Sequence, residues 1–153
     1  MPDILVLGLG NPILSDDRVG IEVAYRIEEK HNAGVDVIEA SVGGLGLLDL
    51  IVGYEKLIVV DSIKTEDGSP GALYRLELDD LERTIHTSSP HDTNFATAIE
   101  FGKRCGLSVP ENIHIYAIEI EDNTTFSEQL TPPVEKAVPQ IVDTIVKEQF
   151  GVE

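Results

Sequence analysis

The sequence has one cysteine, no tryptophan and few aromatic residues. The lone Cys105 excludes a disulfide within the chain and any metal site built from several cysteines. We expect Cys105 to be a small apolar residue of a helix, with a reactive thiol as the alternative. No apolar run is long enough to span a membrane, and Met1-Pro2-Asp3 lacks the basic start of a secretory signal. We therefore expect a soluble protein of the cytoplasm with no membrane partner.

Basic residues are also scarce. The chain has 11 lysines and arginines against 28 aspartates and glutamates, and its formal net charge is −17. This excess of negative charge repels phosphate backbones and anionic lipid, so nucleic acid is not expected as a partner. The charge does not choose among a basic protein partner, a salty cytoplasm and solubility alone.

Linkers, internal repeats and low-complexity tracts are absent as well, so the 153 residues predict a single domain over residues 1–153. Apolar strand-like segments alternate with amphipathic helical ones. Strands are predicted at 4–7, 35–40, 57–60, 72–78 and 113–120, and helices at about 16–30, 47–51, 91–106 and 131–146. This order predicts an α/β three-layer sandwich: a mostly parallel central sheet of about five strands with helices on both faces, and segment 72–78 antiparallel at one edge. Pro139 is expected to bend the last helix or to split off its first turn.

Three side chains suited to metal binding are predicted at the carboxyl edge of this sheet. Asp17 follows the first strand, Asp61 ends the central strand, and His91 enters the third helix. Ligands of open parallel sheets bind at that edge. Two carboxylates and an imidazole suit a divalent transition metal and leave coordination positions open for water or substrate. Singly, each residue has an ordinary explanation as a helix-end charge, a turn cap or a first-turn residue, so the prediction depends on their convergence.

Other polar positions carry weaker signals. Gly43 and Gly44 lie in a glycine-rich loop whose backbone amides could approach a ligand closely, although a tight turn packing helix on sheet explains them equally well. His114 lies within an apolar strand and is expected to be structural, whereas His31 and His86 lie in polar segments.

Several motifs, each weak alone, occur in an order that resembles one family over nearly the whole chain. They are Gly8-Leu9-Gly10-Asn11, Ser15-Asp16-Asp17-Arg18-Val19-Gly20, Gly43-Gly44-x-Gly46, Val60-Asp61, Ser89-Pro90-His91-Asp92 and Leu130-Thr131-Pro132. Together they resemble the hydrogenase maturation endopeptidases. The resemblance implies a compact α/β hydrolase that removes the C-terminal extension from the nickel-loaded precursor of a [NiFe]-hydrogenase large subunit.

The resemblance also implies roles for single residues. Asp17, Asp61 and His91 occupy the family's metal-binding positions, which are also its catalytic positions. The metal is nickel carried by the substrate, and other divalent metals can occupy the same site. Gly43 and Gly44 would present backbone groups to the C-terminal peptide.

The attacking group stays open at this point. No serine or cysteine nucleophile is apparent, and we expect an aspartyl protease-like reaction. A metal-bound water, or Asp16 or Asp61 acting as a base, are the alternatives.

Three other functions compete with this interpretation. The opening Gly8-Leu9-Gly10-Asn11-Pro12 also looks like peptidyl-tRNA hydrolase, but the next histidine, His31, lies far beyond the short spacer expected there, and the net charge opposes RNA. A dinucleotide-binding fingerprint fails because Ile13 occupies the third glycine position. A non-catalytic chaperone that binds the nickel site would use the same residues as the protease.

Overall fold

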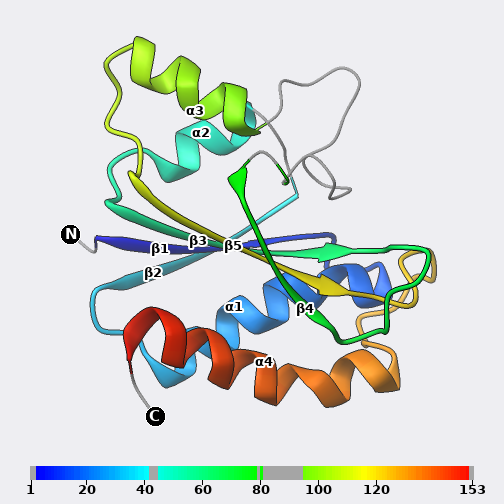
Figure 1. Ribbon diagram of the computed structural model, residues 1–153. Helices are drawn as coiled ribbons and strands as arrows, with labels where there is room; N and C mark the ends of the chain where they lie inside the picture. The colour runs from blue at the N-terminus through cyan, green and yellow to red at the C-terminus, as the bar shows by residue number, and fades with distance from the viewer. Residues whose placement is uncertain (1–2, 42–44, 79, 81–94, 152–153) are drawn as a thin grey trace.

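The computed structural model of the chain describes residues 3–41, 45–78, 80 and 95–151. The elements are, in chain order, β1 (Ile4–Leu9), the 3-10 helix η1 (Ser15–Arg18), α1 (Val19–Lys30), β2 (Val35–Ala40), α2 (Leu45–Ile51), β3 (Lys56–Ile63), β4 (Leu73–Leu76), α3 (Phe95–Arg104), β5 (Asn112–Glu119) and α4 (Pro132–Phe150). Figure 1 shows the strands side by side between two pairs of helices.

The five strands form one sheet in the order β2-β1-β3-β5-β4. β1 pairs in parallel with β2 and β3, and β3 pairs in parallel with β5. β4 is antiparallel to β5, with Leu73 opposite Ile118 and Leu76 opposite Ile115. The predicted mostly parallel sheet with an antiparallel edge strand is therefore confirmed.

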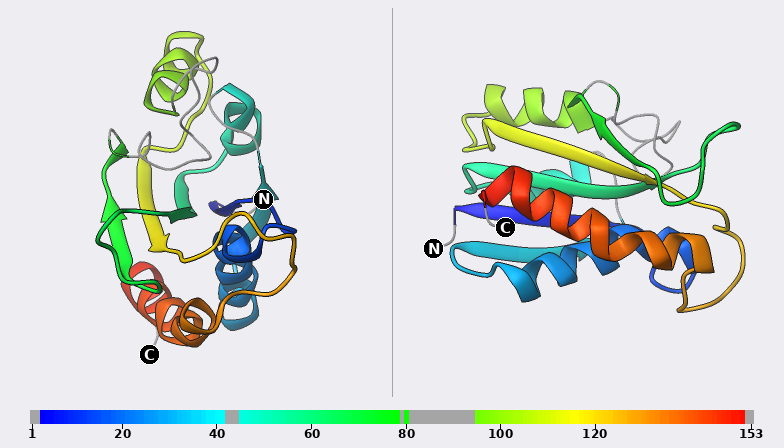
Figure 2. Two further views of the ribbon diagram at one scale, coloured as in Figure 1. Left: turned by 90° about the vertical axis from the view of Figure 1, so that its right-hand side faces the viewer. Right: turned by 60° about the horizontal axis from the view of Figure 1, so that its bottom comes forward.

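Helices cover both faces of the sheet, as the two views of Figure 2 show: α1 and α4 lie on one face and α2 and α3 on the other. Alternate residues of β3 supply the two cores. Ile58 and Val60 pack with α1 and α4, whereas Leu57 and Val59 pack with α2 and α3. A parallel strand covered on both faces needs apolar residues at consecutive positions, which explains why this segment lacks polar alternation.

The helices differ from expectation in three places. The segment predicted as the start of the first helix is the separate 3-10 turn η1, which leads directly into α1. Pro139 lies inside α4, but the helix runs unbroken from Pro132 to Phe150, so its first turn is not split off. Cys105 is exposed and follows the end of α3, so the expectation of an apolar helix residue was wrong.

In the described part of the chain, no helix has the length and apolarity needed to cross a membrane.

Two histidines lie where the sequence placed them. His114 is a half-buried residue of β5, and burial together with the nearby charge of Lys56 lowers its pKa. His31 follows α1, where its ring stacks on Phe150 at 4.2 Å between centroids. Neither histidine is near the carboxyl edge of the sheet, which agrees with the prediction that both lie outside the candidate site.

Close backbone contact fixes α1 on the sheet. A Cβ atom on Gly20 would lie 2.3 Å from the carbonyl oxygen of Val60 in β3 and 2.9 Å from that of Leu9 in β1. Only glycine allows the first turn of α1 to approach both strands this closely. The residues just before this turn, including Asp16 and Asp17, are thereby held at the carboxyl ends of β1 and β3.

The buried carboxylate of Asp16 connects η1 to a distant part of the chain. Its two oxygens accept hydrogen bonds from the backbone N–H groups of Glu121 and Asp122, both at 3.0 Å, and from the N–H and hydroxyl of Thr131, both at 2.7 Å. The backbone N–H of Asp16 also donates to the carbonyl of Asp122 at 2.9 Å. These bonds fix the segment between β5 and α4 against η1.

The backbone contact at Gly20 predicts a large effect of one methyl group. Gly20→Ala should lower the free energy of unfolding by about 1–3 kcal/mol, because the new Cβ meets backbone oxygens that cannot move alone. Urea unfolding measures this loss. Glu29→Ala, on the exposed side of the same helix, is the control, and equal stabilities of the two variants would contradict the close contact.

The bonds of Asp16 predict a second loss of stability. Asp16→Ala should cost about 3 kcal/mol or more, because it leaves three backbone N–H groups without their acceptor. Asp16→Asn should cost less, since its amide oxygen still accepts. The measurement is urea unfolding, together with hydrogen exchange at Thr131. Asp49→Ala at an exposed position of α2 is the control. Equal free energies of unfolding for Asp16→Ala and Asp49→Ala would refute the stabilising role of the Asp16 hydrogen bonds.

Candidate functional site

Asp17 and Asp61 lie at the carboxyl edge of neighbouring strands, and both are buried. Asp17 belongs to η1 and is 4% exposed, and Asp61 is a fully buried residue of β3. The loop from β1 to η1 brings Asp17 back over the sheet through Gly10, where a Cβ atom would lie 2.1 Å from the carbonyl oxygen of Asp17. Both carboxylates lie toward this edge as predicted, but β3 continues for two residues beyond Asp61, to Ile63, so Asp61 does not end the strand as expected.

The carboxylate of Asp17 is held at both oxygens. Its Oδ1 accepts the hydroxyl of Ser62 at 3.0 Å, and its Oδ2 accepts the backbone N–H of Asn11 at 3.0 Å. Ser62 is fully buried and follows Asp61 in β3. These two hydrogen-bond donors offset the free-energy cost of burying a carboxylate, which is high for an ionised group without hydrogen bonds.

Ser62 contacts both candidate metal ligands. Its backbone N–H donates to Oδ1 of Asp61 at 2.8 Å, while its hydroxyl donates to Asp17. One residue thus links two acidic side chains that are far apart in the sequence. The sequence interpretation missed Ser62, and the available signal was a hydroxyl residue directly after Asp61 in an otherwise apolar strand.

Asp17 and Asp61 both supply carboxylate oxygens at this edge, which is a ligand type that divalent metals use. His91, Gly43 and Gly44, the other predicted site residues, lie outside the described residues. Among residues 3–41, 45–78, 80 and 95–151, no group of three histidine, cysteine, aspartate or glutamate side chains is placed to hold a metal ion. The described residues of the candidate site therefore supply carboxylate oxygens, and the imidazole ligand from His91 remains a prediction.

Asp16, the further candidate base, faces a different part of the structure. Four donors from Glu121, Asp122 and Thr131 occupy its two oxygens. A carboxylate engaged in this way fixes neighbouring backbone and has little capacity left to accept a proton from water. The geometry favours a structural role for Asp16 over a role as base.

A further buried carboxylate, Glu119, was not singled out by the sequence. It accepts the backbone N–H and hydroxyl of Thr65, both at 2.7 Å, and the hydroxyl of Tyr74 at 3.0 Å. The hydrogen bond to Glu119 raises the pKa of Tyr74. These bonds shape the segment between β3 and β4, where a cavity of about 450 Å³ opens beside Ile63, two residues after Asp61. The only sequence signal was a polar residue within an apolar strand.

A second cavity, of about 640 Å³, lies at the opposite edge of the sheet. Its lining includes Ile4, Lys56 and Asn112, which are the first residues of β1, β3 and β5. Because it opens at the amino ends of the strands, it is separated from Asp17 and Asp61 by the length of the sheet. It contains none of the predicted site residues.

Comparison with known proteins identifies the family. The model of a family described as hydrogenase maturation protease matches residues 19–148, a range that includes Asp61 and His91 and begins two residues after Asp17. The hydrogenase 2 maturation protease of Escherichia coli K12 is 24% identical, and the alignment covers 98% of this chain and 93% of that protein.

Solved structures agree in fold. The hydrogenase maturating endopeptidase HybD from E. coli superposes with a TM-score of 0.77 at 24% identity, over 100% of this chain and 96% of that one. A hydrogenase 2 maturation peptidase from a Thaumarchaeota archaeon gives a TM-score of 0.67 at 28% identity, over 98% and 99% of the two chains. With the family model covering most of its length, this chain belongs to the hydrogenase maturation proteases and is a peptidase.

Proposed function

We propose that the protein removes the C-terminal extension from the nickel-loaded precursor of a [NiFe]-hydrogenase large subunit, and that it recognises the substrate's nickel through Asp17, Asp61 and His91. The observation that carries this proposal is the contact of Ser62 with both buried carboxylates, which fixes two oxygen ligands at one edge of the sheet. The family supports the peptidase class of the reaction.

The donor set fits a metal that the substrate brings with it. Carboxylate oxygens and an imidazole bind divalent first-row metals, and three protein ligands leave coordination positions open. The substrate can fill those positions with its own ligands. A weak and open site of this kind distinguishes a precursor that carries nickel from one that does not, because only the loaded precursor completes the coordination.

Hydrolysis adds one water molecule across the peptide bond: the carbonyl carbon gains the hydroxyl and the leaving amine gains the proton. We assign the proton of the attacking water to Asp61 rather than to Asp16, because four donors occupy the two oxygens of Asp16. The substrate's nickel would polarise the carbonyl that is attacked. Gly43 and Gly44 would bind the backbone of the C-terminal peptide.

The reaction is tested by following the mass of the precursor. The wild-type protein should shorten nickel-loaded precursor and leave nickel-free precursor intact, and Asp17→Asn and Asp61→Asn should each lower kcat/KM at least about 100-fold. Asp143→Asn, at an exposed position on α4, is the control. Binding of the loaded precursor without cleavage would favour the chaperone, and full activity of Asp17→Asn would overturn the metal site.

Removing the hydroxyl of Ser62 should weaken nickel recognition. Ser62→Ala removes the hydroxyl that orients Oδ1 of Asp17, and loss of a residue that orients a metal ligand costs about 10–100-fold in metal affinity. We expect KM for the loaded precursor and Kd for Ni²⁺ alone to rise by this factor. Ser108→Ala, at an exposed position near the opposite edge of the sheet, is the control. A lower melting temperature with unchanged KM and Kd would mean that Ser62 is only structural.

A further inference from the structure

Two loops meet beside Asp17. One joins β1 to η1 and the other joins β5 to α4, and residue Leu14 of the first forms an isolated parallel bridge with Ser127 of the second. The N–H of Ser127 donates to the carbonyl of Ile13, and the N–H of Ser15 donates to the carbonyl of Ser127, both at 2.9 Å. The two loops therefore form one continuous surface at the carboxyl edge.

This surface exposes apolar side chains. Phe126 is 80% exposed and Ile13 is 48% exposed, and Pro12 next to Ile13 is exposed as well. We call these three residues the apolar lip. Exposed aromatic and aliphatic side chains gathered at the edge of a candidate site are typical of surfaces that bind another protein.

The loop that carries Phe126 is firmly held. The carboxylate of Asp122 accepts the N–H of Thr124 at 2.9 Å and the N–H and hydroxyl of Thr125 at 3.1 and 2.6 Å. These bonds, that of the Thr125 hydroxyl foremost, lower the pKa of Asp122 to about 2. Together with the bonds of Asp16, they order the lip before any partner arrives, which reduces the entropy lost on binding.

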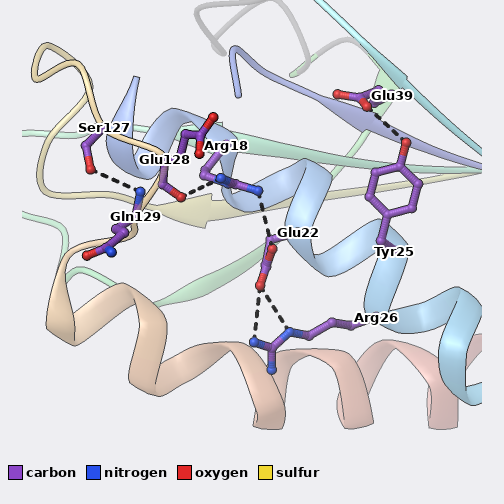
Figure 3. A network of polar contacts seen from close by, with 8 residues as sticks. All are labelled: Arg18, Glu22, Tyr25, Arg26, Glu39, Ser127, Glu128 and Gln129. Carbon is purple, nitrogen blue, oxygen red and sulfur yellow. Dashed lines mark hydrogen bonds and ion pairs between the residues drawn. The ribbon is translucent and has the colours of Figure 1, made fainter. Parts of the chain in front are cut away.

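An acidic cavity adjoins the lip. It has a volume of about 290 Å³ and is lined by Arg18, Glu22, Glu128, Gln129, Leu130 and Glu135. Figure 3 shows the guanidinium of Arg18 between the carbonyl oxygen of Glu128 and the side chain of Glu22. Glu22 is paired with both Arg18 and Arg26, so Glu128 and Glu135 supply the excess negative charge of the cavity, which suits a lysine or arginine of a partner.

We propose that the apolar lip and this cavity form the docking surface for the hydrogenase precursor, which packs an apolar side chain on Phe126 and places a lysine or arginine in the cavity. The inference rests on the proposed function. Asn11, which precedes Pro12 of the lip, donates its backbone N–H to Asp17, so a precursor that presents its metal to Asp17 comes close to the loop that carries the lip. A second copy of this chain is disfavoured as occupant, since each copy has a net charge of −17.

The experiment compares variants on nickel-loaded precursor. Phe126→Ser and Ile13→Ser should each raise KM at least about tenfold with kcat unchanged, as expected for residues that bind substrate away from the reacting bond. Phe101→Ser is the matched control, because Phe101 is 51% exposed on α3. The double variant Glu128→Gln with Glu135→Gln should raise KM and weaken its dependence on salt, whereas Glu111→Gln near the opposite edge should change neither.

Each outcome separates this inference from the proposed function. Failure of the wild-type protein to shorten the precursor would overturn the proposed function, and the lip is then judged by the Kd of the precursor for wild type and Phe126→Ser. Equal KM and Kd values for Phe126→Ser and Phe101→Ser would overturn the docking surface, as would a loss of kcat alone. Wild-type dimers that Phe126→Ser converts to monomers would assign the lip to a second copy instead.

Discussion

The close approach of α1 to β1 and β3 is the constraint on which the rest of the site depends. Gly20 lets the first turn of the helix contact backbone oxygens of both strands, so η1 must lie directly over their carboxyl ends. From there Asp17 reaches Ser62 on β3, and Asp16 reaches the segment before α4. A helix one side-chain layer farther from the sheet would carry both carboxylates away from these partners.

Buried acids perform different tasks in this protein according to their donors. Asp16 and Glu119 are saturated by backbone and hydroxyl donors and fix the segments around the site. Asp17 and Asp61 instead each accept one donor of Ser62, the hydroxyl and the backbone N–H respectively. Adjacent aspartates in the sequence can thus differ in role, because successive residues of a 3-10 turn point in different directions.

Sequence patterns predicted the sheet and its edge strand because burial on one or both faces leaves a direct record in the order of apolar residues, as in β3 and β4. They also placed Asp17 and Asp61, since strand ends fix which edge of a parallel sheet a residue occupies. The patterns could not reveal the acceptor role of Asp16 or the bridge through Ser62. Those contacts join positions about 45 and 115 residues apart, and only the packed structure brings them together.

The hydrogen bonds between Asp16 and Thr131 limit when this part of the structure can form during synthesis. The two residues are 115 positions apart, so their hydrogen bonds can form only after β5 and the start of α4 have left the ribosome. Until then, η1 and the loop from β1 lack their hydrogen bonds to the segment between β5 and α4. A growing chain therefore cannot complete this part of the candidate site until β5 and the start of α4 have been synthesised.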